Sequence, residues 1–182
     1  MCTKYPEQGP DSLSTQLGKF LYRRQRLGQL LRDEIAHMQE RSDEADIGWE
    51  FPGCEEDILY EVEYGHVGHL TCDECDRGRA RPRHPRADTL PSVHDGLIAS
   101  GNAVLKDAAI RETLIKQRAL AVEMEACGVS RKFIVVRGIS DYADSHKNDI
   151  WQPYAAATAA SCARLSTALT GEIRFHLLQE VK

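Results

Sequence analysis

The spacing of hydrophobic residues near the start of the chain predicts an amphipathic helix over residues 12–40. Large apolar side chains recur there at intervals of three, four and six residues, at Leu13, Leu17, Leu21, Leu27, Leu31, Ile35 and Met38. Ser12 is a residue type suited to cap such a helix. Gly18 and Gly28 each weaken a helix interior by ~1 kcal/mol relative to alanine, so we expect this helix to depend on docking.

Residues 41–92 show no sustained hydrophobic period, and we expect them to form a loop-rich insert. Glycine, proline and acidic residues interrupt every apolar stretch, and the arginine-rich run RGRARPRHPR follows at 77–86. A segment of this length without regular secondary structure is unusual inside a compact domain. Either something specific orders it, or part of it is mobile.

A regular apolar pattern returns at Val93 and predicts an α/β core over residues 93–174. The stretch HDGLIASG indicates a short buried strand that ends in small residues. The following AVLKDAAIRETLIKQ is typical of a helix with Val104, Ala108 and Leu114 on one side.

The rest of this core continues the alternation of strands and helices, which favours an α/β fold with parallel pairing. RALAVEMEACGV begins as a strand and is expected to become a helix near Glu125. Four consecutive apolar residues at 133–136 predict a strand covered on both faces, and an alanine-rich helix is expected over 153–180. Ligands of open α/β sheets bind beyond the carboxyl ends of strands, where Ser140 and Asp141 are expected.

Length, charge and cysteine content narrow the class of protein. The 182 residues predict one domain, preceded by a short tail at 1–11. The net charge of −5 gives no broad attraction for nucleic acid or an anionic membrane, and no apolar run reaches the ~18 residues of a membrane span. The tail has no apolar segment typical of a secretion signal, so we expect a soluble, cytoplasmic protein. In a protein of this kind, the six cysteines of the chain are expected to be free thiols or metal ligands, without a disulfide framework.

Three short motifs carry the chemistry that the sequence suggests: GLIASGN (96–102), AVEMEACG (121–128) and VVRGISDYAD (135–144). In this order and spacing they resemble the nucleoside phosphorylase superfamily, which includes purine nucleoside phosphorylases and methylthioadenosine nucleosidases. The stretch at 144–160, DSHKNDIWQPYAAATAA, resembles a large fungal group in which this domain often precedes ankyrin or NTPase regions. The resemblance implies a three-layer α/β/α fold and cleavage of the N-glycosidic bond of purine nucleosides.

Cleavage of this bond builds oxocarbenium character on the sugar and negative charge on the departing base, so an acid must protonate the base. The resemblance assigns this role to Asp141, whose acidity partial burial would have to weaken. It assigns to Glu125 the hydrogen bonds to the ribose hydroxyls and to Met124 a contact with the sugar face. Further substrate contacts are implied for Val104, Leu105, Ser100 and Asn102. A purine nucleoside is the expected ligand, with phosphate as co-substrate if phosphate rather than water attacks.

Structural roles for the same residues remain open. An aspartate that follows a strand commonly caps a helix or stabilises a turn, which is an alternative for Asp141. Glu123 and Glu125 alternate in an expected strand and could both face solvent. Asp144 and Arg137 are expected to be structural charges that form ion pairs near the end of a strand.

The resemblance begins at about Asp11 and covers only the second half of the family's domain, so residues 12–174 are interpreted as a partial domain and 175–182 as the end of its last helix. The glycine-rich phosphate-binding loop of the family's first half has no counterpart in the sequence. We therefore expect a truncated fold with an incomplete sheet, which a second copy or a complementary subunit would cover. A catalytically inactive remnant or an interaction module is the alternative function.

The insert contains four metal-ligating residue types at equal spacing, His66, His69, Cys72 and Cys75. We take His66, Cys72 and Cys75 as the better candidates for a structural zinc site, because four consecutive ligands in so short a loop would strain a tetrahedral site. A loop with reduced thiols and no metal is the competing interpretation.

The arginine-rich run at 77–86 could form an arm that binds nucleic acid. It contains Pro82 and Pro85 and lacks interleaved aromatic residues. These features favour a solvated connector, and no nucleic-acid partner is expected.

Overall fold

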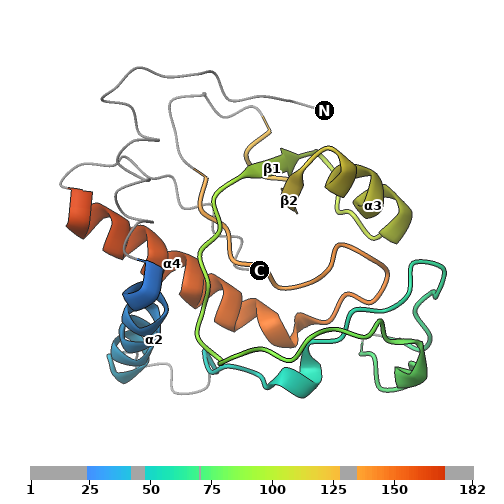
Figure 1. Ribbon diagram of the computed structural model, residues 1–182, viewed down its shortest axis with the longest axis horizontal. Helices are drawn as coiled ribbons and strands as arrows, with labels where there is room; N and C mark the ends of the chain where they lie inside the picture. Colours follow the sequence, from blue (N-terminus) through green and yellow to red (C-terminus); the bar gives the residue numbers. More distant parts are fainter. Residues whose placement is uncertain (1–23, 42–47, 70, 128–134, 171–182) are drawn as a thin grey trace.

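The computed structural model describes residues 24–41, 48–69, 71–127 and 135–170, which form a mixed α/β structure (Figure 1). The regular elements, in chain order, are α2 (Arg24–Glu40), η1 (Cys54–Glu56), η2 (Arg77–Arg79), β1 (Leu97–Ser100), α3 (Ala108–Lys116), β2 (Ala119–Glu123), η3 (Asp149–Trp151) and α4 (Gln152–Thr170). The predicted tails at 1–11 and 175–182 lie outside the described residues, as do 12–23 and 171–180 of the two predicted helices. None of the helices in the described part combines the length and apolar character that a membrane span requires.

Helices α2 and α4 pack against each other through a cluster of buried apolar side chains (Figure 1). Leu27 and Leu31 of α2 are buried against Cys162 of α4, as the hydrophobic period of α2 predicts. Val93 and Val136 pack against this cluster from two other segments. The helix pair therefore holds two further segments of the chain, one around Val93 and one around Val136.

Gly28 has a packing role that the sequence pattern did not reveal. A β-carbon at this position would lie 2.9 Å from the carbonyl oxygen of Pro91 and 3.0 Å from Cβ of Leu90. The segment that leads from the insert to β1 therefore crosses α2 in direct contact with its backbone. The lower helix propensity of glycine is offset by this close approach.

The sheet consists of β1 and β2, which pair in parallel with Leu97 opposite Ala119 and Ser100 opposite Glu123. Helix α3 connects the two strands, so the predicted succession of strand, helix and strand is confirmed. Asp107 caps α3, because its carboxylate accepts hydrogen bonds from the backbone N–H groups of Ala109 and Ile110 at 2.8 and 3.0 Å.

Two predicted elements differ from the structure. Residues 124–127 form bends and a turn rather than the start of a helix. Residues 135–140 have no regular secondary structure and belong to no strand, while 133 and 134 lie outside the described residues. In the described chain the ladder contains only β1 and β2, and Gly138 instead packs directly against the backbone of Ala155 in α4. A mixed α/β structure is thus observed, whereas the three-layer arrangement remains an expectation.

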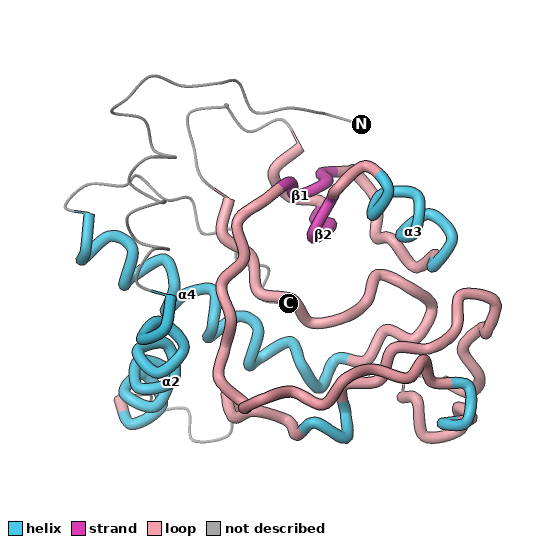
Figure 2. The backbone as a smooth tube through the Cα atoms, viewed as in Figure 1, coloured by secondary structure: helices cyan, strands magenta, loops and turns pink. Residues whose placement is uncertain are grey.

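The described part of the insert is largely irregular (Figure 2). Long-range polar contacts order these residues. Asp57 forms ion pairs with Arg83 and Arg86 at 2.8 and 2.9 Å, and Tyr142 donates a hydrogen bond to its Oδ1 at 2.5 Å. Burial raises the pKa of Asp57, but these hydrogen bonds outweigh it and the net shift is downward. The arginine-rich run, expected to be a solvated connector, thus contributes to the folding of the insert.

The helix contact provides a direct test of the fold. Leu31 is fully buried, whereas its neighbour Leu30 is 42 % exposed. We expect Leu31→Ala to lower the free energy of unfolding by about 2–5 kcal/mol because it leaves a cavity between α2 and α4. Leu30→Ala, the matched control, should change it by no more than about 0.5 kcal/mol. Urea unfolding monitored by circular dichroism measures both, and equal effects would contradict the packing described.

Candidate functional site

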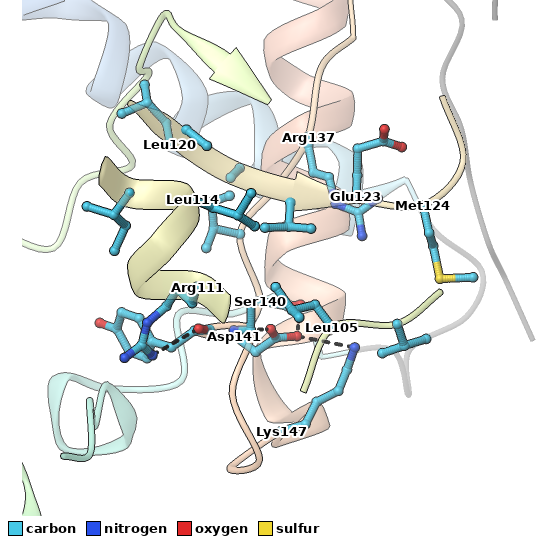
Figure 3. Close-up of a pocket in the computed structure, with 18 of the residues that line it drawn as sticks. Leu105, Arg111, Leu114, Leu120, Glu123, Met124, Arg137, Ser140, Asp141 and Lys147 are labelled. Carbon is cyan, nitrogen blue, oxygen red and sulfur yellow. Dashed lines mark hydrogen bonds and ion pairs between the residues drawn. The ribbon is translucent and has the colours of Figure 1, made fainter. Parts of the chain in front are cut away.

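A pocket of about 260 Å³ lies beside β2 and α3 (Figure 3). Its walls come from the whole of β2, from one face of α3, and from the segments 103–105 and 137–143, with Lys147 at one side. The loops that follow β1 and β2 contribute to it, which agrees with the expectation that ligands bind beyond the carboxyl ends of parallel strands. The pocket therefore brings together residues from the second and third sequence motifs and from the segment that directly follows the first.

Four of the seven residues predicted to contact substrate line this pocket: Val104, Leu105, Met124 and Asp141. Val104 precedes α3 rather than lying on one of its faces, and it is half exposed. Ser100, Asn102 and Glu125 lie outside the lining. Ser100 is at the end of β1 opposite Glu123, and Asn102 is exposed in the following loop.

Asp141 is held in a fixed orientation at the wall of the pocket (Figure 3). Its Oδ1 accepts a hydrogen bond from the backbone N–H of Ala143 at 2.9 Å, and Ser140 Oγ donates to its Oδ2 at 3.2 Å. The ammonium group of Lys147 lies 3.4 Å from the same Oδ2. The carboxyl group thus lies between a turn of its own backbone and a cation. The contact with Ala143 is the local turn stabilisation that the sequence left open as an alternative.

Glu123, at the end of β2, is almost completely buried, so the alternative in which it faces solvent is wrong. Its Oε2 accepts hydrogen bonds from the backbone N–H groups of Glu125 and Ala126 at 2.7 and 2.6 Å. Burial raises the pKa of Glu123, but hydrogen bonding to its carboxylate, that from these two N–H groups included, outweighs it, and the net shift is downward. Glu123 therefore shapes the turn that presents Met124 and Glu125.

Glu125 lies just outside the pocket and is held by a residue that lines it. Arg137 Nη1 donates to Glu125 Oε2 at 2.5 Å, and the backbone N–H of Met124 donates to the same oxygen at 3.1 Å. The side chain of Glu125 remains 16 % exposed. The ion pair gives Arg137 the structural pairing that the sequence suggested, with Glu125 as its partner.

A second ion pair fixes the segment that carries Asp141. Arg111 Nη1 of α3 lies 2.9 Å from Asp144 Oδ2, and it also donates to the carbonyl oxygen of Tyr142 at 3.1 Å. Both charged side chains are less than a tenth exposed. Arg111 and Lys147 were not singled out from the sequence, because their importance follows from contacts between distant segments.

The candidate metal ligands also come together in the structure. One ligand atom from each of His66, Cys72 and Cys75 lies within 4.8 Å of the other two. His69, the fourth residue of the spaced pattern, is exposed and does not belong to this group.

Comparison with known proteins identifies relatives over most of the chain. It is 37% identical over 161 residues to a nucleotide-binding leucine-rich repeat (NLR)-like protein of the fungus Hyaloscypha variabilis, an alignment that covers 86% of this chain. It is 36% identical over 77 residues, or 37% of its length, to ATP nucleosidase Cap17 of Escherichia coli. The alignments span about 15% of the length of each of these relatives. No family model and no solved structure matches the chain.

The buried carboxylate of Glu123 predicts a stability that depends on pH. Its pKa in the folded state is lower than the ordinary value of 4.5, so its hydrogen bonds stabilise the fold fully above pH 4.5 and are lost as the pH falls through the folded pKa. We expect Glu123→Gln to lower the free energy of unfolding by about 1–3 kcal/mol at neutral pH. The difference in the free energy of unfolding between Glu123→Gln and the unsubstituted protein should shrink as the pH falls below 4.5.

Urea unfolding at a series of pH values measures this difference. Glu63→Gln is the matched control, because Glu63 is exposed and has no recorded polar contact among the described residues. A Glu123→Gln effect that stays constant down to acid pH would exclude a buried ionised carboxylate as its cause.

Proposed function

We propose that the protein binds a purine nucleoside or nucleotide in this pocket and cleaves its N-glycosidic bond. The observation that carries this proposal is the convergence of Asp141, Lys147 and the Met124–Glu125 turn beside one pocket. The similarity to a relative named as an ATP nucleosidase supports the same chemistry. Its name also makes ATP a substrate to test alongside the nucleosides.

The acid in this reaction is Asp141. As the bond between C1′ and the purine nitrogen breaks, its electron pair moves to the base, and the carboxyl group of Asp141 gives its proton to a ring nitrogen. An oxygen of water or phosphate then bonds to C1′, and with water the surplus proton leaves to solvent. Lys147, 3.4 Å from Asp141 Oδ2, stabilises the carboxylate that this proton transfer leaves behind.

Glu125 binds the ribose in this proposal. Its carboxylate accepts hydrogen bonds from the sugar hydroxyls, which requires that they share or displace the contact with Arg137. Glu123 is a positioning residue, because its carboxylate holds the backbone of Glu125 and Ala126 without reaching solvent. The fixed turn limits the motion of the sugar and so favours the reactive geometry.

The rest of the pocket suits a flat, largely apolar base. Aliphatic side chains dominate its lining, namely those of Val104, Leu105, Leu114, Ile115, Leu120, Val122 and Ile139. The volume of about 260 Å³ lies near the lower end of small-molecule sites, which run from roughly 300 to 1,000 Å³. A ligand of nucleoside size therefore fits better than a large cofactor.

The central test uses Asp141→Asn, which keeps the size of the side chain but removes its acidic proton. We expect the unsubstituted protein to release free base from at least one purine nucleoside or from ATP, and the variant to be slower by about 10²–10⁴-fold. Liquid chromatography of the released base, with and without inorganic phosphate, measures the rate and identifies the nucleophile.

Asp95→Asn is the matched control, because Asp95 is exposed and makes no recorded contact within the described chain. It should retain the full rate. No base release from any substrate in either condition would refute the enzyme and favour the inactive remnant or interaction module instead.

The role of Glu125 predicts a difference between ribose and 2′-deoxyribose substrates. Glu125→Gln weakens a hydrogen bond from a sugar hydroxyl to a charged acceptor, so kcat/KM for the ribonucleoside should fall by about 10–100-fold. The loss should be smaller for the 2′-deoxy compound, which lacks one of the donors. Steady-state kinetics with both substrates test this, and an equal loss for both would assign Glu125 to the fold rather than to the sugar. Glu63→Gln again serves as control.

A further inference from the structure

The cluster of His66, Cys72 and Cys75 has the geometry of three metal ligands. The backbone N–H of Cys75 donates to the carbonyl oxygen of Cys72 at 3.1 Å, and this turn allows both thiols to approach one centre. A ligand atom of His66 completes the group within 4.8 Å. Two cysteines and a histidine are the donor set typical of a structural zinc site, which requires a fourth protein ligand.

The contacts of His66 fit the orientation of a metal ligand. Its Nε2 lies 3.0 Å from the carbonyl oxygen of Thr71. A proton on Nε2 would be donated to this oxygen, which leaves the lone pair of Nδ1 available. Histidine ligands commonly donate their second ring nitrogen to a backbone carbonyl in this way. The backbone N–H of His66 also donates to Ser145 Oγ at 3.1 Å, so this loop touches the segment around residue 145.

His146 is a second, independent feature that points to a ligand. Its side chain is 3 % exposed, yet neither ring nitrogen has a hydrogen-bond partner among the described residues. The ring stacks on Tyr60, with centroids 4.1 Å apart, and its centroid lies 5.7 Å from that of His66. Cys72 Sγ lies 3.8 Å from the carbonyl oxygen of His146. Burying an imidazole whose nitrogens make no hydrogen bond costs free energy, unless a ligand such as a metal ion binds one of these nitrogens.

We propose that Zn²⁺ binds to His66, Cys72, Cys75 and His146 in a tetrahedral site. Nδ1 of His146 lies 3.7 Å from Asp144 Oδ1, so a carboxylate–histidine–zinc arrangement would use Nε2 as the ligand. The ring nitrogens of His146 are not within 4.8 Å of all three other ligand atoms, and the metal therefore draws this ring inwards. Four protein ligands leave no position for substrate, which makes the site structural.

The site would connect the insert to the wall of the pocket. Asp144 lies between His146 and Arg111: its Oδ1 accepts the backbone N–H of His146 at 2.9 Å, and its Oδ2 binds Arg111. Asp141 and Lys147 belong to the same segment. Zinc therefore fixes the backbone that carries both groups, although it is not part of the reaction.

Metal analysis of the purified full chain after dialysis tests the proposal. We expect about one zinc ion per chain, and its loss from His66→Ala, Cys72→Ser, Cys75→Ser and His146→Ala. Two matched controls should retain it: His69→Ala in the same loop, and Cys54→Ser, since Cys54 is an exposed free thiol. A zinc content near zero in the unsubstituted protein would overturn the site. Retention of zinc by His146→Ala would overturn His146 as the fourth ligand, and loss of zinc from His69→Ala would overturn the assignment of His69 as a bystander.

X-ray absorption spectroscopy of the unsubstituted zinc protein gives a readout that does not depend on whether a variant folds. We expect two sulfur ligands at about 2.3 Å and two nitrogen ligands at about 2.0–2.1 Å. A first shell with only one nitrogen and an oxygen would overturn the role of His146. A shell of oxygen and nitrogen without sulfur would overturn the whole site.

Discussion

The buried ion pair between Arg111 and Asp144 is the interaction on which the pocket depends. Arg111 belongs to α3, which packs on the sheet, whereas Asp144 belongs to a segment without regular structure. Removing one partner of such a pair leaves an uncompensated charge, which typically costs about 3–5 kcal/mol, a large part of the roughly 5–15 kcal/mol by which a domain is stable. Arg111 also donates a hydrogen bond to the carbonyl oxygen of Tyr142, so the segment from Tyr142 to Asp144 is held against α3.

Polar contacts of the same kind replace a hydrophobic core in the insert. Asp57 binds two arginines and Tyr142, and Glu61 pairs with Arg79. Tyr60 forms an isolated bridge with Ala80, and only a few apolar side chains of the region are buried. A region held in this way has a defined backbone without helices or strands, provided that the charges are paired.

The sequence predicted those parts of the fold that depend on local patterns. The period of apolar residues in α2, the succession of β1, α3 and β2, and the alanine-rich α4 are all local signals. The apolar run at 133–136 predicted a strand, but its described residues, 135 and 136, join no ladder, because a strand needs a neighbour and the nearby Gly138 packs on α4 instead. The order within the insert could not be predicted, because it depends on pairs such as Asp57 and Tyr142, 85 residues apart.

For the candidate site, the motifs singled out Asp141 and Met124, which line the pocket, whereas the contacts of Glu123, Lys147 and His146 became evident only in three dimensions. Gly28 has a comparable dependence on distant residues. The helix that contains it completes its packing when Leu90 and Pro91, more than sixty positions later, lie across it. Closing so long a loop carries an entropic cost that must be met before the contact forms, so we expect α2 to dock in a late, cooperative stage of folding rather than in an early local nucleus.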